Sequence, residues 1–336
     1  MKTLLIAGAA LLATAPAASA QTLPPTDPPP PAPPVQPVPP PTQPAEGKGA
    51  ISLTGGLSDG GKRYVAAGQK VRVTGRVKPF AAGQVIVVEL FRGSKRVARR
   101  VIAVKQASDG NGQFTVDFKP RTAGAYTIKA RHKATSEQAR FTIARQRFTA
   151  LGGSVNGGSG RTTIRVAQIA LKRQAFVTPV SGHWDSATSR AVLAFSKTNR
   201  MSRNGSISKK GFAMLLNGKG TFKLRYPNAG KHVEADLSRQ VLVLARGGKA
   251  ERIYHMSSGK PSTPTVVGTF HFYRKSPGTN SHGMVHSSYF IRGYAIHGYA
   301  SVPNGAASHG CLRVPIPNAR SIFDWISLGD RIDVYH

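Results

Sequence analysis

The spacing of apolar residues changes twice along this chain, and each change marks a differently built segment. Apolar and polar residues alternate over residues 48–145, whereas apolar residues recur every three to four positions over residues 150–220. Alternation returns from residue 228 onward. Alternation is typical of strands, and the longer spacing is typical of helices. A chain of 336 residues with these changes is expected to form several domains.

The first segment is predicted to be a β-sandwich. Its alternating runs are separated by turn signals at residues 92–95 and 109–112, which are rich in Gly, Asn and Asp. Several short strands at this spacing favour an immunoglobulin-like sandwich over residues 48–147. The Cys-Trp-Cys pattern of antibody domains is missing, so the topology is inferred from strand spacing alone.

The N-terminal residues predict export. Lys2 precedes an apolar run over residues 4–13, and Ala18-Ser19-Ala20 follows, which is the pattern of a signal peptide over residues 1–20. The alternative is that residues 1–20 are not cleaved and anchor the chain at its N-terminus. The run carries no following cysteine, which excludes a lipoprotein, and no later stretch is apolar enough for a transmembrane helix. We expect an exported chain, located in the cell wall, the periplasm or the extracellular space.

A proline-rich spacer is predicted to follow. Residues 21–47 contain 13 prolines, which favours an extended polyproline II segment that forms no core.

The charge lies mainly before the last segment. Residues 48–227 contain 34 Lys or Arg and 6 acids, whereas residues 228–336 contain 12 and 6. A field of this sign attracts polyanions in a salt-dependent manner. Export and an aromatic content of 7% argue against nucleic acid, so we expect anionic wall polymers or phospholipid head groups as partners. The alternative is that the positive charge keeps the protein soluble and has no specific partner.

The helical segment is predicted to contain three helices. Asp185 or Ser186 is suited to cap the second helix and Ser208 the third. Residues 180–195 resemble the peptidoglycan-binding-like three-helix module, with a Gly-containing turn, an aromatic residue, a Thr and then Ala-Val. This resemblance implies such a module over residues 150–220. Its apolar residues serve either a core or a glycan or stem-peptide contact.

Cys311 is the only cysteine, so it cannot form a disulfide within the chain. It lies in the cluster 308–313 (Ser-His-Gly-Cys-Leu-Arg), and His297 lies 14 residues earlier in Ala-Ile-His-Gly. A thiol becomes a nucleophile when a base or a positive group is near, and histidine suits that task near neutral pH. Gly310 allows a substrate to approach the backbone closely. The pattern predicts a catalytic cysteine.

These clusters resemble the signature of the L,D-transpeptidase catalytic domain family. The resemblance extends over residues 228–336 and includes residues 257–265 and 328–335. It implies a mainly-β domain that cross-links cell-wall peptides. We expect a hairpin around residues 238–239. Further strands are expected at 251–257, 267–273 and 291–297, a helix at 318–327 and a closing strand at 332–335.

The resemblance also implies roles for individual residues. Cys311 corresponds to the acylated nucleophile, His297 to its base, and Gly298 to the carbonyl that orients the imidazole. The amides of Gly310 and Cys311 correspond to the oxyanion hole. Residues implied or expected to contact substrate or to shape its loop are Ser308, His309, Arg313 and Tyr289. Arg313 either meets a stem-peptide carboxylate or braces the loop.

No metal or cofactor is expected. His282 and His286 are four positions apart, but their Ser- and Gly-rich surroundings argue against a helix and no third ligand is evident. The stretch 276–290 is instead interpreted as a lid or substrate loop.

The sequence thus predicts an exported L,D-transpeptidase that acts on peptidoglycan stem peptides through a cysteine thioester. Three alternatives remain open: an L,D-carboxypeptidase with water as acceptor, a wall-binding protein with an inactive catalytic domain, and a hydrolase like a cysteine protease. Intact His297 and Cys311 argue against the inactive domain.

Overall fold

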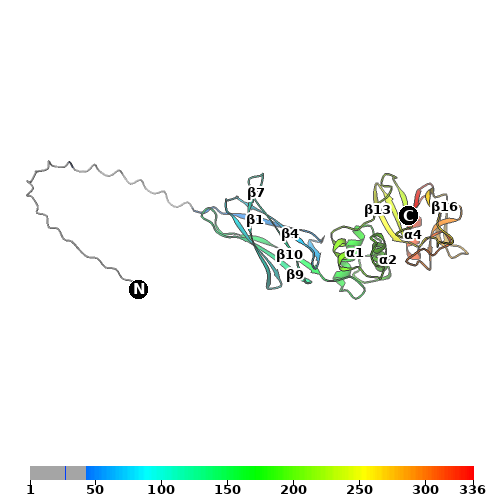
Figure 1. Cartoon of the computed structure of the whole chain (residues 1–336), viewed down its shortest axis with the longest axis horizontal. Helices are drawn as coiled ribbons and strands as arrows, with labels where there is room; N and C mark the ends of the chain where they lie inside the picture. Colours follow the sequence, from blue (N-terminus) through cyan, green and yellow to red (C-terminus); the bar gives the residue numbers. More distant parts are fainter. Residues whose placement is uncertain (1–26, 28–42) are drawn as a thin grey trace, which may run out of the picture. The chain divides into compact units, whose positions relative to one another are not determined.

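The computed structural model describes residue 27 and residues 43–336. The predicted signal peptide and most of the predicted proline-rich spacer lie outside these residues. The chain divides into residues 1–42 and residues 43–336, and the second unit contains the helices and strands given below (Figure 1). Within the described residues, no helix has both the length and the apolar character needed to span a bilayer.

Residues 48–151 form two sheets around one apolar core. The first sheet has the order β1 (Lys48–Thr54), β4 (Val71–Lys78), β8 (Gly112–Phe118) and β7 (Lys105–Gln106). The second has the order β2 (Leu57–Asp59), β3 (Lys62–Ala66), β10 (Thr142–Leu151), β9 (Gly124–His132), β5 (Val85–Arg92) and β6 (Lys95–Ala103). Strand β10 continues past residue 147, where the sequence predicted the domain to end. The immunoglobulin-like topology stays a prediction.

Strand β4 confirms the predicted alternation, because buried and exposed residues alternate at every position. Gly75 lies on the buried face of this strand, directly opposite Phe114 of β8. A Cβ atom at Gly75 would lie 2.0 Å from the Phe114 ring. Glycine is therefore required at this position because the aromatic ring occupies the space of a side chain.

Three helices follow: α1 (Arg161–Arg173), α2 (Ser186–Thr198) and α3 (Lys209–Leu216). Asp185 caps α2 by accepting the Thr188 amide at 2.6 Å, and Ser208 caps α3 by accepting the Gly211 amide at 3.1 Å. Both caps agree with the sequence-based prediction and satisfy amides that have no partner inside the helix. The relation to peptidoglycan-binding modules stays a prediction.

The last segment is mainly β, with two sheets and one helix. The first sheet has the order β13 (Lys249–His255), β12 (Val241–Arg246), β11 (His232–Asp236), β19 (Arg331–Tyr335) and β14 (Gly268–His271). The second has the order β15 (Arg274–Thr279), β16 (Val285–Ile291), β17 (Tyr294–Tyr299) and β18 (Leu312–Pro315), and β18 leads into α4 (Ile316–Trp325). Residues from both sheets and α4 share one core.

The three helices share a second core with this last segment. Their apolar faces cluster with Val241 and Val243 of β12 and Ile253 of β13. The alternate residues of the same strands, such as Leu242 and Leu244, belong to the core on the other side. The sheet is therefore buried on both faces, which explains why β12 is apolar at nearly every position.

Two features of this segment differ in detail from the sequence-based predictions. The strand predicted at 291–297 is β17, which begins later, at Tyr294, after a turn where Arg292 has a φ of 48°. The stretch 276–290, interpreted as a lid or substrate loop, consists largely of the paired strands β15 and β16, and its lid role stays a prediction. Ser287 and Ser288 are buried within β16, so small polar residues that suggested a loop are packed inside a strand.

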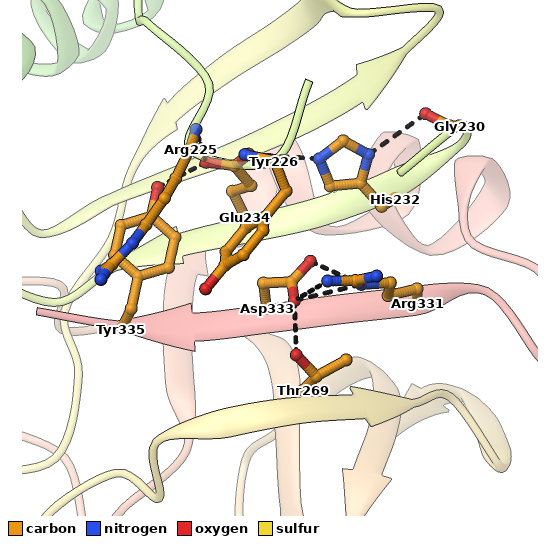
Figure 2. A network of polar contacts seen from close by, with 9 residues as sticks. All are labelled: Arg225, Tyr226, Gly230, His232, Glu234, Thr269, Arg331, Asp333 and Tyr335. Carbon is orange, nitrogen blue, oxygen red and sulfur yellow. Dashed lines mark hydrogen bonds and ion pairs between the residues drawn. The ribbon is translucent and has the colours of Figure 1, made fainter. Parts of the chain in front are cut away.

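Buried Glu234 connects the first and last strands of this segment to the chain that arrives from the helices (Figure 2). Its carboxylate accepts the amides of Arg225 and Tyr226 at 3.0 and 2.8 Å, and it also accepts the Tyr335 hydroxyl. Nε2 of His232 lies 3.2 Å from the same carboxylate. This network fixes residues 225–226 against β11 and β19.

Candidate active site

The parallel pairing of β17 with β18 brings the predicted nucleophile and base together. His297 lies opposite Arg313, and Cys311 directly precedes β18, two positions before Arg313. Side chains two positions apart on an extended chain point to the same face. Both Cys311 and His297 line a cavity of about 370 Å³. The structure thus brings together two residues that are 14 positions apart in the sequence.

His297 is held in one tautomer. Its Nδ1 lies 2.9 Å from the Gly298 carbonyl oxygen, which only accepts hydrogen bonds, so Nδ1 carries the proton. Nε2 then has a free lone pair and is able to accept a proton. A Cβ atom at Gly298 would lie 2.7 Å from Cβ of Ala319 in α4, so the close approach of α4 requires glycine here.

Burial shifts the pKa values of both Cys311 and His297. Burial raises the pKa of the Cys311 thiol, and the Ala295 amide and the Arg313 charge act in the opposite direction. Burial lowers the pKa of His297, the Gly298 carbonyl opposes this, and the Arg313 charge adds to it. Both pKa shifts are in the direction that favours a neutral thiol and a neutral imidazole.

Ser308 holds the loop that carries Cys311. Its hydroxyl donates to the Cys311 carbonyl oxygen at 2.6 Å and accepts the Gly310 amide at 3.0 Å. The Gly310 amide is therefore already bonded within the loop, and an oxyanion would compete with Ser308 for it. The Cys311 amide is the other half of the predicted oxyanion hole.

The stretch 257–265 supports this loop through its backbone. Ser257 and Arg313 exchange two backbone hydrogen bonds of 2.9 Å. The Ser258 carbonyl accepts the amides of Ala307 and Ser308 at 2.8 and 2.9 Å. These residues belong to a motif that carried the family resemblance, and the structure shows that they frame the cysteine loop.

Further bonds extend this support to both sides of the cysteine. The Lys260 amide donates to the Ser308 carbonyl at 2.9 Å, and the Thr265 hydroxyl donates to the Gly310 carbonyl at 2.7 Å. A Cβ atom at Gly310 would lie 2.5 Å from the Tyr294 ring, and Gly310 has a φ of 116°. Glycine is required there on both counts.

The remaining walls of the cavity are aromatic and basic. The residues that line it are His282, Met284, His297, Tyr299, Ser308, His309, Cys311 and Arg313. The Arg313 guanidinium lies 4.1 Å from the centre of the Tyr299 ring, and His297 meets that ring edge-on at 5.7 Å. Sequence reasoning missed Tyr299. Its position two residues after His297 was the available signal, because alternate residues of a strand share a face, but the predicted strand ended at residue 297.

Tyr289 lies away from this cavity. It is 8% exposed on β16, and the Arg274 guanidinium covers its ring at 3.9 Å. The structure places Tyr289 among structural residues rather than on the cavity wall.

The two histidines that were weighed as metal ligands do not converge. His282 lines the cavity, whereas the His286 ring lies 5.4 Å from the Phe323 ring and accepts the Gly278 amide. Among the described residues, no group of three or more His, Cys, Asp or Glu side chains is arranged to hold a metal ion.

These observations define a class of structure: a mainly-β domain in which a histidine and a cysteine line the same cavity. Residues 230–334 match the family model for the L,D-transpeptidase catalytic domain. The C-terminal segment of the chain is therefore similar to the L,D-transpeptidase catalytic domain.

Individual proteins are also similar to parts of this chain. L,D-transpeptidase 1 from Mycobacterium tuberculosis is 31% identical over 126 residues, which covers 30% of this chain and 48% of the relative. The match thus spans about half of the length of that curated relative. The crystal structure of an L,D-transpeptidase from Xylanimonas cellulosilytica is 29% identical, covers 54% of this chain and 97% of its own, and has a TM-score of 0.49. An L,D-transpeptidase from Mycobacterium smegmatis is 14% identical over 86% of this chain and 99% of its own, with a TM-score of 0.28.

Proposed function

We propose that this chain is an exported L,D-transpeptidase that cross-links peptidoglycan stem peptides through a thioester on Cys311. The cavity shared by Cys311 and His297, within a domain of this family, is the observation that carries the proposal. The acyl donor is a tetrapeptide stem, cleaved between its third residue and the terminal D-Ala. The acceptor is an amine of a neighbouring stem.

Each step uses groups of this cavity. Nε2 of His297 takes the proton from Sγ of Cys311 as the sulfur attacks the donor carbonyl. The Cys311 amide donates to the oxygen that becomes negative. When the intermediate collapses, the C–N bond breaks and His297 returns the proton to the departing amine of D-Ala. The acceptor amine then attacks the thioester, and its proton returns through His297 to Cys311.

The covalent step is tested by intact-mass spectrometry. A carbapenem mimics the acyl donor of this family, so the mature chain should gain the mass of one adduct. Cys311→Ala should gain none, because the chain has no second thiol. An adduct of equal yield in Cys311→Ala would refute Cys311 as the nucleophile.

The base is tested by comparing two histidines that line the same cavity. His297→Ala should slow acylation by roughly 100- to 10,000-fold, the range of a positioned base. His309→Ala is the matched control and should have a much smaller effect. A larger loss in His309→Ala would transfer the role of base to His309.

An L,D-carboxypeptidase is the second candidate, because water in place of the acceptor amine would use the same Cys311 and His297. Mass spectrometry of the products from a disaccharide tetrapeptide, with and without an acceptor stem, separates the two. Cross-linked dimers support the transpeptidase, whereas a tripeptide as the sole product supports the carboxypeptidase.

We further propose that the basic segments retain the enzyme on anionic wall polymers. Residues 48–151 contain 21 Lys or Arg and 5 acids, and residues 152–227 contain 13 and 1. Attraction between exposed charges is screened over ~10 Å at 0.1 M salt. Pelleting with purified sacculi should therefore decline steeply as salt increases. Retention that is independent of salt would contradict this proposal.

A further inference from the structure

Lys197 of α2 is fully buried, although it carries an ionisable group. None of its surface is exposed, and its Nζ donates to the Met256 carbonyl oxygen at 2.8 Å. Burial lowers the pKa of Lys197 to about 7, and the charge of Arg203 adds to this effect. The bond joins the helical segment to the catalytic domain across 59 residues of sequence.

Packing alone does not explain a lysine at this position. The charged or titratable groups that influence it are Arg203, His255 and, through His255, Arg190, all of which are basic. In the part of the chain that the structure describes, Lys197 forms no ion pair with a carboxylate. A buried charge without a counter-charge is costly, and methionine would fill a similar volume without that cost. The amino group instead donates a hydrogen bond that methionine lacks the donor to make.

The carbonyl that Lys197 holds lies next to the support of the active-site loop. Met256 directly precedes Ser257 and Ser258, whose backbone bonds hold Arg313, Ala307 and Ser308. Any shift of Met256 is transmitted to the two residues that frame Cys311.

The helical segment makes a second contact with the same loop. The Arg203 guanidinium, in the turn after α2, donates to the Asn304 carbonyl oxygen at 2.7 Å. The Ser257 hydroxyl donates to the neighbouring Gly305 carbonyl at 2.6 Å. Lys197 and Arg203 therefore contact the two backbone stretches, around residues 256 and 304, that converge on the cysteine loop.

We propose that the helical segment positions the active site, with Lys197 as the principal positioning residue and Arg203 as a second one. The Lys197–Met256 bond fixes residues 257–258, and these hold residues 304–311 so that Cys311 keeps its place beside His297. Lys197 touches no reacting atom. This inference rests on the proposed acylation of Cys311.

The test compares Lys197→Met with Lys172→Met, the same substitution at an exposed lysine of α1. Each full-length variant is measured for melting temperature, for acylation by a carbapenem and for alkylation by iodoacetamide. Alkylation is measured at alkaline pH, where the thiol ionises without His297, so it reports access to the thiol and not its place beside the base. Lys197→Met should acylate about tenfold more slowly with nearly unchanged melting and alkylation, because small displacements of reacting groups are costly. The Lys172→Met control should resemble the wild type.

Hydrogen exchange provides a readout that does not depend on activity. The amides of Ala307, Ser308 and Arg313 should exchange faster in Lys197→Met than in Lys172→Met. Arg203→Gln is the second variant, because Arg203 is exposed and its loss leaves the core intact. It should slow acylation by about threefold, since it removes one of two contacts with the loop.

The outcomes separate this inference from the proposed function. Equal acylation in Lys197→Met and Lys172→Met would overturn the positioning role. A parallel loss of melting temperature, alkylation and acylation would show a merely structural role and would also overturn it. If the wild type were not acylated at all, the proposed function would fail. Faster exchange in Lys197→Met would then still support the loop contact, and unchanged exchange would reject it.

Discussion

The β-sandwich and the helical segment differ in how far their cores extend. The sandwich core is built from residues of its own strands. The core of the helical segment also includes Val241, Val243 and Ile253 of the catalytic sheet, and Leu57, Ala66 and Leu151 at one end of the sandwich. A change of hydrophobic period near residue 228 therefore marks a change of secondary structure but not the boundary of a folding unit.

The shared core affects the stability of the sheet that contains β12 and β13. Val241, Val243 and Ile253 are almost completely buried by the helices. Fully burying such a side chain contributes roughly 1.5–3 kcal/mol, and a whole domain is stable by only about 5–15 kcal/mol. The catalytic sheet thus depends on the helical segment for a large part of its stability.

Truncation should have the largest effect. A chain of residues 222–336 should lack a cooperative thermal transition and acylate poorly, because one face of its sheet is exposed to water. A chain of residues 153–336 keeps that cover and should melt cooperatively and acylate. Calorimetry and intact-mass analysis of both chains provide the measurement. Equal melting temperatures would contradict the shared core.

Two phenylalanine substitutions should separate the two cores. Phe195 of α2 packs edge-on against Phe176 at 5.5 Å, and Phe114 lies in the sandwich core. Replacing either by alanine should cost about 3–5 kcal/mol. Phe195→Ala should lower the temperature at which acylation is lost, and Phe114→Ala should leave that temperature unchanged.

The measurement is a thermal inactivation series, with acylation of Cys311 assayed after each temperature step. Phe114→Ala is the matched control, since it removes the same ring from a buried site. If Phe114→Ala reduced acylation as strongly as Phe195→Ala, the sandwich core would not be independent.

The Glu234 network should make the stability of the last segment (residues 228–336) depend on pH, with a loss at both low and high pH. Burial acts to raise the pKa of Glu234, but hydrogen bonds from His232, Arg225 and Tyr335 outweigh it, so the pKa is lowered. Burial acts to lower the pKa of His232, but bonds to Glu234 and Gly230 outweigh it, so the pKa is raised. Both residues are thus charged in the folded state around pH 5–6.

Glu234 and His232 contribute to the free energy of unfolding with opposite dependence on pH. The contribution of Glu234 is present above the usual carboxyl pKa of 4.5 and is lost as the pH falls through its lowered value. The contribution of His232 is present below the usual 6.5 and is lost as the pH rises through its raised value. Stability measured by urea unfolding should therefore be highest between about pH 4.5 and 6.5. Glu234→Gln should cost about 3 kcal/mol there and flatten the profile. An unchanged profile in Glu234→Gln would show that other groups set the dependence.

The smallest expected effect concerns a helix cap. Asp185→Ala removes the acceptor of the Thr188 amide and hydroxyl, and should cost about 1 kcal/mol. Because α2 packs on β13, the loss should appear in the unfolding of the catalytic unit and not in that of the sandwich. Ser208→Ala at α3 is the matched control, with a similar expected cost. A cost confined to the sandwich transition would contradict the shared core.

The sequence alone was sufficient for features whose cause is local. Alternation in β4 and the caps of α2 and α3 depend on neighbouring residues, so they were predicted correctly. The candidacy of Cys311 and His297 also followed from residue chemistry and spacing. Tyr289 was placed near the substrate without such a signal, and the structure buries it beneath Arg274.

Only the tertiary structure decided which distant residues meet. The parallel pairing of β17 with β18 places Cys311 and His297 on one cavity, and no local pattern encodes that register. The shared core at Val243 and the bond from Lys197 to the Met256 carbonyl likewise join parts of the chain that are far apart in sequence. The physical reason is that burial and hydrogen bonding act between neighbours in space, whereas periodicity and capping act between neighbours along the chain.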